Sequence, residues 1–159
     1  MNAHDVLMYG HLWVHKHLDG LTEEQWLTPG VCGVWSVKDI IAHLSSFEQL
    51  LVEVFASCLG PAETHTLDSF TSQDGDAFNA EQVGQRMHLS VDEMLQDYNE
   101  RYEAAMTLLS HINENVLRQP GTIPWYGKEY SMEDLIVYQY YGHKREHCAQ
   151  IAIYRDQLP

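Results

Sequence analysis

Two pairs of histidines have the spacing that places two imidazoles on one face of a helix. His143 and His147 form one pair, and His11 and His15 form the other. Ten histidines in 159 residues would give about 0.6 such pairs by chance, so the spacing alone is weak evidence for a site. A neutral imidazole donates a ring-nitrogen lone pair to zinc, nickel or copper, and two rings one turn apart can share an ion. Metal binding is therefore the chemistry to test against the rest of the sequence.

The later pair is predicted to face a core. At about 100° per residue, His143 and His147 fall about 40° apart on a helix. The same arc holds four apolar or aromatic positions: Ile136, Tyr140, Ile151 and Tyr154. Lys144 and Arg145 are expected to point away from it. In the earlier pair, His11 lies at the edge of the apolar stripe and His15 lies further toward solvent. This pair is therefore predicted to lie on the protein surface.

A third ligand is expected from a facing helix, and His43 is the candidate. It sits beside the apolar stripe of Ile40, Leu44 and Phe47 and so faces inward. Three imidazoles leave open positions for water or substrate, as catalytic zinc sites do. The residues alone leave two interpretations open. His43, His143 and His147 either share one metal ion or are core histidines bonded to tyrosines or backbone groups.

Residues 143–147 also match H-x-x-E-H, the motif of inverted zinc peptidases, in which Glu146 would be the general base. Such a site needs a further ligand well downstream, and only twelve residues follow His147. We therefore expect Glu146 to support a ligand or to be a solvated charge. Tyr140 and Trp35 are other candidates near the site, and the pattern assigns no catalytic residue.

Four long helices, separated by segments rich in Gly, Pro and Asp, would position these side chains. They are predicted at about residues 3–19, 36–59, 90–116 and 131–155. The last three each begin at a serine followed by an acidic residue three positions on, which is a capping pattern. No stretch alternates with a period of two for long. The sequence therefore predicts an all-α protein with one domain, residues 1–159, folded as a four-helix bundle.

Long loops are predicted between the second and third helices and between the third and fourth. Residues 61–78 show little periodicity, and residues 79–88 are expected to form a short helix. Residues 119–129 make the other loop. Loops of this length are unusual in a compact domain and are expected to line a site. The polar positions expected on the outer face of the second helix are Lys38, Ser45, Gln49 and Glu53.

The composition of the chain argues against two classes of binding partner. A net charge of −14 argues against nucleic acid and against anionic membrane surfaces, because binding to either needs clustered Lys and Arg.

The sequence also bears on the location of the protein. No uninterrupted apolar run approaches the roughly 18 residues of a membrane span, and the first residues lack a signal-peptide pattern. Three widely spaced cysteines suit a reducing compartment, with Cys58 and Cys148 expected in the core. A cytoplasmic protein is expected.

Two stretches, residues 34–44 and 141–151, resemble the DinB/YfiT-like superfamily. The first has an aromatic residue, a capping serine and a histidine seven positions after that serine. The second holds the later histidine pair. The resemblance covers essentially the whole chain, including helix order and long loops. It implies a four-helix bundle, often a homodimer, with a nickel or zinc ion on His43, His143 and His147.

The resemblance also implies classes of activity. The superfamily includes thiol-dependent enzymes, such as mycothiol-dependent maleylpyruvate isomerase and bacillithiol S-transferases, and metal-dependent hydrolases. The expected function is a hydrolase or a low-molecular-weight-thiol-dependent transferase acting on a small molecule, with one divalent metal ion and a thiol as cofactors. The alternative is a non-catalytic, metal-bearing protein that binds a small toxic molecule. The superfamily name records damage-inducible expression and gives no reason to expect DNA repair.

Overall fold

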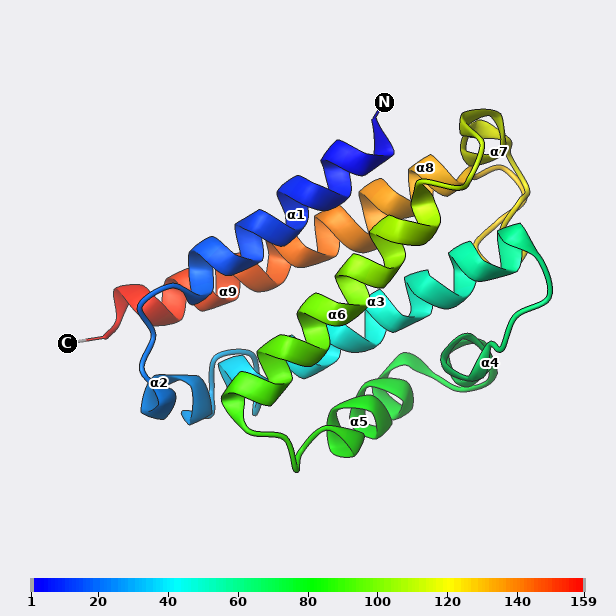
Figure 1. Cartoon of the computed structure of the whole chain (residues 1–159). Helices are drawn as coiled ribbons and strands as arrows, with labels where there is room; N and C mark the ends of the chain where they lie inside the picture. The colour runs from blue at the N-terminus through cyan, green and yellow to red at the C-terminus, as the bar shows by residue number, and fades with distance from the viewer. Residues whose placement is uncertain (1, 159) are drawn as a thin grey trace.

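A computed structural model of the chain describes residues 2–158 and contains the four predicted long helices (Figure 1). The first three are α1 (Ala3–Leu18), α3 (Val37–Leu59) and α6 (Val91–Leu109). The last is continuous in space and runs through α8 (Met132–Leu135), the π-helical segment η1 (Ile136–Gly142) and α9 (His143–Asp156). Within residues 2–158 the β pairing is limited to one isolated bridge, so the all-α prediction is confirmed.

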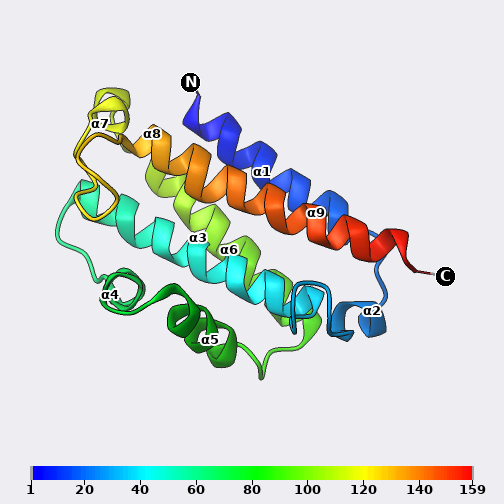
Figure 2. The same ribbon diagram turned by 180° about the vertical axis from the view of Figure 1, so that it is seen from behind.

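The long helices pack as two pairs. α3 lies along α6, and α1 lies along η1 and α9, as the two opposite views agree (Figures 1 and 2). Two shorter helices, α4 (His65–Ser72) and α5 (Gly75–Gln85), cover the side of α3 that faces away from α1. α2 (Glu23–Leu27) packs on α3, and α7 (Glu114–Arg118) packs on α8. α3 is therefore enclosed by helices on several sides.

Reciprocal capping fixes where the site-bearing helices begin. At the start of α3, the Ser36 hydroxyl accepts a hydrogen bond from the Asp39 backbone N–H at 3.2 Å. The Asp39 carboxylate in turn accepts from the Ser36 backbone N–H at 2.9 Å. The other two predicted boxes also form: Ser90 with Glu93, and Ser131 with Asp134. These boxes satisfy backbone donors that a helix start leaves unpaired.

α3 is the central helix of the bundle. By length and composition it is the one helix among the described residues that could cross a membrane, yet 78% of its apolar window is buried inside the protein. The prediction of an outer polar face on α3 is wrong for Ser45 and Glu53, which are both buried. Ser45 donates to the Asp97 carboxylate of α6 at 2.5 Å. The sequence pattern did not show that α4, α5 and α6 would cover these polar positions.

The predicted loop at residues 61–78 is also wrong, because it contains α4 and the first residues of α5. A long-range contact stabilises the start of α4. The Glu53 carboxylate accepts from the backbone N–H groups of Thr66 and Leu67, at 3.2 and 2.8 Å. Periodicity within the segment cannot reveal a cap supplied by another helix. The short helix expected at residues 79–88 is present as α5, and residues 119–129 contain turns only, as predicted.

The third long helix ends earlier than predicted. α6 stops at Leu109, and α7 begins five residues later with the Asn113 side chain accepting from the Asn115 backbone N–H. The apolar residues Ile112 and Val116 continue the stripe in sequence but lie beyond the helix end. All three cysteines are free, with Cys148 buried as expected and Cys58 half-buried.

Candidate metal centre

Three imidazoles from two helices meet inside the bundle. His43 Nε2, on α3, lies 2.8 Å from His143 Nε2, and His147 Nε2 lies 3.0 Å from the same atom. The three ligand atoms all lie within 4.8 Å of one another. Two nitrogens bonded to one zinc ion at 2.0–2.1 Å can be at most about 4.2 Å apart, so both measured separations fit a shared ion. The structure thus brings together the three histidines predicted as ligands.

The hydrogen-bonding capacity of these rings would suit a bound cation. A ring nitrogen carries either one proton or one lone pair, so His143 Nε2 cannot form full hydrogen bonds with both of its neighbours. The Gln150 side-chain oxygen lies 2.8 Å from His147 Nδ1 and accepts a hydrogen bond from the N–H group there. That bond leaves the lone pair of His147 on Nε2, which is the tautomer that binds a metal. A metal ion accepting three lone pairs satisfies all three Nε2 atoms at once.

Burial keeps the three rings neutral. It lowers the pKa of His43 to about 2, helped by the neighbouring His143 and His147, while the Asn79 side chain opposes the shift. It also lowers the pKa of His143 to about 3, helped by His147 and Lys144. The pKa of His147 is lowered by burial as well. Neutral imidazoles have a free lone pair at pH 7, so no proton has to leave before a metal binds.

Aromatic rings form walls beside the three histidines. The Trp35 ring centroid lies 5.0 Å from that of His43, and the Phe47 centroid lies 4.6 Å from that of His143. Trp35, predicted near the site, is therefore beside it. Tyr140 is buried, and its hydroxyl has no hydrogen-bond partner among the described residues. Glu146 is exposed, and its negative charge partly opposes the lowering of the His147 pKa.

The prediction that Lys144 points away from the core is wrong, because the helix before it is not a regular α-helix. Lys144 is buried and pairs with Glu48 of α3. The preceding segment η1 has i→i+5 hydrogen bonds, so each of its turns contains about one residue more than an α turn. Residues after it are displaced by about one position around the axis. The core stripe therefore continues from Tyr140 to Lys144 and Cys148, with His143 and His147 beside it.

The earlier pair is not the simple surface feature that was predicted. The His11 ring stacks on Tyr102 with centroids 3.7 Å apart and planes at 6°. Burial lowers the pKa of His11 to about 3. His15 Nε2 lies 2.8 Å from the Asn99 side-chain oxygen. Both rings face α6, because the pair formed by α3 and α6 closes over this side of α1.

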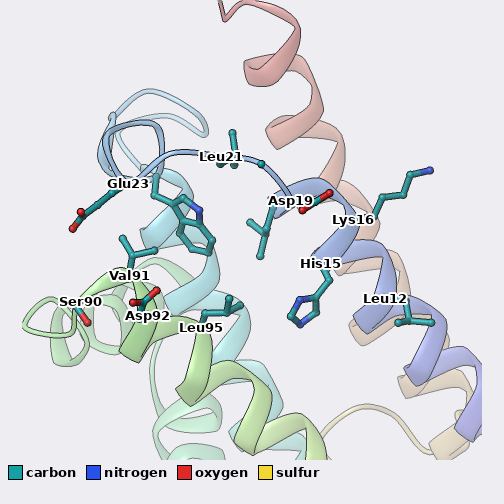
Figure 3. Close-up of a pocket in the computed structure, with 13 residues that line it drawn as sticks. Leu12, His15, Lys16, Asp19, Leu21, Glu23, Ser90, Val91, Asp92 and Leu95 are labelled. Atoms are coloured by element: carbon teal, nitrogen blue, oxygen red, sulfur yellow. The ribbon is translucent and has the colours of Figure 1, made fainter.

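A large hollow lies away from the three histidines. It has a volume of about 720 Å³ and lies between α1, α2 and the start of α6 (Figure 3). Trp26, Leu21 and Leu95 supply apolar surface, and Asp19 and Asp92 supply carboxylates at its edge. None of the triad residues lines it. This hollow is therefore separate from the candidate metal centre.

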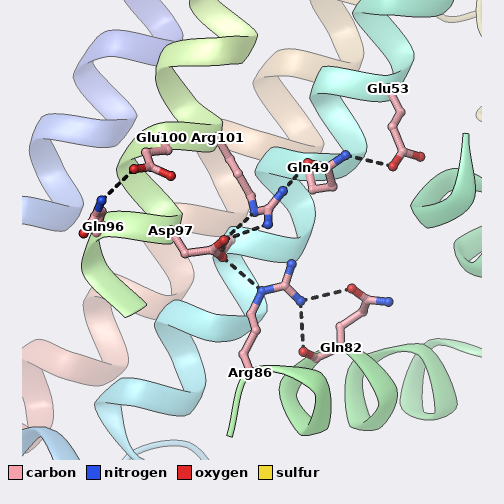
Figure 4. Close-up of polar contacts among 9 residues, drawn as sticks. Gln49, Glu53, Gln82, Arg86, Gln96, Asp97, Glu100 and Arg101 are labelled. Atoms are coloured by element: carbon pink, nitrogen blue, oxygen red, sulfur yellow. Dashed lines mark hydrogen bonds and ion pairs between the residues drawn. The ribbon is translucent and has the colours of Figure 1, made fainter. Parts of the chain in front are cut away.

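A polar chain links the long helices to the helices that cover the site (Figure 4). Asp97 accepts from Arg86 Nε at 3.1 Å and from Arg101 Nη2 at 2.7 Å. Arg101 also donates to Gln49 of α3, and Gln49 donates to Glu53 at 2.9 Å. Since Glu53 caps α4, this chain connects α6, α3 and α4, while Arg86 extends it to the end of α5. Charges that are largely removed from water are thus paired.

Comparison of the sequence with protein-family models gives a match. The model of the DinB superfamily matches residues 14–151, a range that includes all three histidines. Comparison with curated proteins and with solved structures gave no match.

Proposed function

Because this chain belongs to the DinB superfamily, whose members are associated with metals, we propose that it is a metal-dependent enzyme acting on a small molecule. One divalent ion, nickel or zinc, would be held by His43, His143 and His147. The observation that carries the proposal is the convergence of three neutral Nε2 atoms, two of them 2.8 and 3.0 Å from the third. Three protein ligands are the number that catalytic zinc sites use.

The residues around the triad favour transfer from a low-molecular-weight thiol to an electrophile. A divalent ion on three imidazoles leaves positions open and lowers the pKa of a water or thiol bound there, which supplies a nucleophile at neutral pH. Metal hydrolases commonly add a carboxylate as general base. Here Glu48 is paired with Lys144, and Glu146 is exposed to solvent rather than enclosed with the triad, which disfavours both carboxylates for that role. A thiol held by such an ion would release its proton to solvent at neutral pH, so transfer would need no such base.

The chain's own residues have three tasks in this proposal. The histidines bind the ion as neutral ligands, and Gln150 holds the proton of His147 on Nδ1. Trp35 and Phe47 limit water beside the ligands and present apolar surface to an electrophile. Low water access strengthens electrostatic interactions within the site.

Metal content tests the first part of the proposal. Untagged protein should contain about one equivalent of nickel or zinc by plasma mass spectrometry. His43→Ala, His143→Ala and His147→Ala should each lose it. His15→Ala is the matched control and should retain it, because His15 pairs with Asn99 and lies outside the triad. A wild-type protein that is isolated without metal and takes up neither added ion would contradict the proposal.

Turnover tests the second part. Metal-loaded protein is incubated with 1-chloro-2,4-dinitrobenzene and with bacillithiol, mycothiol or glutathione, and the thioether is measured by absorbance. Product that requires both the thiol and the triad supports transfer. Hydrolysis of model esters or amides without a thiol would replace transfer by hydrolysis. Saturable binding without any product would favour the sequestering alternative.

We also propose a homodimer, which the family resemblance implies, and a cytoplasmic location, which the composition favours. Light scattering on the purified protein measures its mass in solution against the 18.3 kDa of one chain. Fractionation of the source cells tests the location.

A further inference from the structure

A buried ion pair joins the same two helices as the three histidines. Lys144 Nζ lies 2.5 Å from Glu48 Oε1, and the two side chains are only 2% and 1% exposed. Glu48 follows His43 by five residues on α3, and Lys144 directly follows His143 on α9. α3 and α9 are therefore linked twice, once through imidazoles and once through an ammonium and a carboxylate.

Stability alone does not account for such a pair. Removing two charges from water costs about as much as their attraction returns, so apolar residues of similar volume are often as stabilising. A buried pair does discriminate strongly between arrangements, because any displacement that separates the charges leaves both unpaired in the core. A shift of α9 by one residue moves side chains by about 1.5 Å along the helix and 100° around it. That shift would separate Lys144 from Glu48 and both α9 histidines from His43.

The side chain of Lys144 is confined by three other helices. Its ammonium lies 5.9 and 5.8 Å from the ring centroids of Tyr98 and Tyr102 on α6. Its aliphatic part lies against α1 at Gly10, where a Cβ atom would be only 3.3 Å from Lys144 Cδ. With α1, α3 and α6 around it, Lys144 has little freedom to follow a rotated α9. The position of its ammonium thus fixes the rotation of the helix that carries His143 and His147.

We propose that Glu48 and Lys144 are positioning residues for the metal centre: their ion pair sets the register of α9 against α3. The two α9 imidazoles are then held beside His43 before any metal binds. This inference rests on the proposed function and adds the reason why the site is formed in advance. A preformed site loses less conformational freedom on binding, which raises its metal affinity.

A double variant separates positioning from structural support. In Glu48→Leu with Lys144→Met, two apolar side chains of similar volume replace the charges, so the fold should persist with a melting temperature equal to or above that of the wild type. Zinc affinity, measured by competition with a chromogenic chelator, should fall about 10–100-fold, as for other residues that orient metal ligands. Arg145→Met is the matched control. It removes the next basic residue of α9, which is exposed, and should leave zinc affinity unchanged.

A second measurement uses metal-free protein. Long-range ¹H–¹⁵N spectra should show one set of ring signals for each triad histidine in the wild type and in Arg145→Met. Multiple or broadened sets are expected in the double variant, because α9 is no longer fixed in one register. A folded double variant with wild-type spectra and wild-type zinc affinity would overturn the positioning role, while zinc binding by the wild type would still support the proposed metal centre.

The metal-centre proposal can also fail while the positioning role of Glu48 and Lys144 is still tested. If wild-type protein takes up no metal, the proposed function is lost, and the spectra of the metal-free proteins decide on positioning. One set of ring signals per histidine in the wild type, replaced by several or broadened sets in the double variant, would support the positioning role. Identical spectra of the two proteins would overturn it.

Discussion

His143 and Lys144 are neighbours in the sequence, yet each contacts a different residue of α3. His143 Nε2 lies 2.8 Å from His43 Nε2, and Lys144 Nζ lies 2.5 Å from Glu48 Oε1. The candidate metal centre and the buried ion pair are thus two adjacent links between one pair of helices. A perturbation of one link is expected to be measurable at the other.

Removal of one charge of the pair should be far more harmful than removal of both. Lys144→Met leaves the Glu48 carboxylate buried without a counterion, which should cost about 3–5 kcal/mol in the free energy of unfolding. The double variant with Glu48→Leu should recover all of that loss. Urea unfolding of the metal-free proteins at pH 7 measures both. Equal stability of the single and double variants would show that the carboxylate finds another partner.

The side chain of Gln150 should affect metal affinity more than stability. Gln150→Leu removes the acceptor 2.8 Å from His147 Nδ1, so the ring loses its preferred tautomer and orientation. Zinc affinity should fall about 10–100-fold. Gln157→Leu, at the exposed end of α9, serves as the control and should bind zinc as the wild type does. Equal affinity in both variants would mean that packing alone orients His147.

The free energy of unfolding of the metal-free protein should begin to fall below about pH 6.5, which is above the pH range in which most carboxylates titrate. The pKa values of His43, His143 and His11 lie at about 2, 3 and 3, and that of His147 is lowered too, whereas an unfolded histidine has a pKa of about 6.5. Below pH 6.5 the unfolded chain therefore binds protons that the folded chain does not. The free energy of unfolding should fall as pH decreases from 6.5 toward 3, by about 1.4 kcal/mol per pH unit for each such group.

Urea unfolding between pH 7 and pH 5, in the presence of a chelator, measures this dependence. The window lies above the range in which carboxylates such as Asp97, whose pKa is lowered, begin to take up protons. His11→Phe should reduce the slope by about one proton and keep the stacking on Tyr102. A free energy that stays constant over this window would contradict the burial of four neutral histidines.

A methyl group at Gly10 should destabilise the fold although alanine favours helices. Its Cβ would lie 3.3 Å from Lys144 Cδ and 3.4 Å from Tyr141 Cδ2, and the ion pair with Glu48 keeps Lys144 from moving aside. Overpacking of this kind costs about 1–3 kcal/mol, more than the roughly 1 kcal/mol gained in helix propensity. Thermal unfolding of Gly10→Ala tests this.

Gly84→Ala is the control for that experiment. A Cβ at Gly84 would have no atom within 4 Å beyond its own helix, so the substitution should stabilise the protein by about 0.5–1 kcal/mol. Stabilisation by both substitutions would show that α1 and α9 are packed less tightly than the structure has them.

Short-range sequence patterns predicted the helices that hold the candidate ligands. Serine caps located the starts of α3, α6 and α8, and apolar periodicity located the long helices. The inward position of His43 followed from the stripe around it, because α3 is regular from Ser36 onward. These predictions were confirmed because residues close together in the sequence determine both the pattern and the structure.

The features that sequence analysis missed depend on distant contacts. α4 was predicted as loop because its cap comes from Glu53, thirteen and fourteen residues before the N–H groups that it binds. Ser45 was placed on an outer face that α6 in fact covers. Lys144 was placed in solvent because a regular α-helix was assumed through η1. Its partner Glu48 lies about a hundred residues earlier, beyond the reach of any local pattern.

The π-helical segment Ile136–Gly142 acts as a one-residue insertion in an otherwise α-helical rod. If the same seven residues formed regular α turns, everything after them would rotate by about 100°. The histidines and Lys144 would then exchange their partners on α3 for other surfaces. In an alignment, a relative with a regular helix here requires a gap within these seven positions. Without that gap, its metal ligands would be assigned one position away from those of this chain.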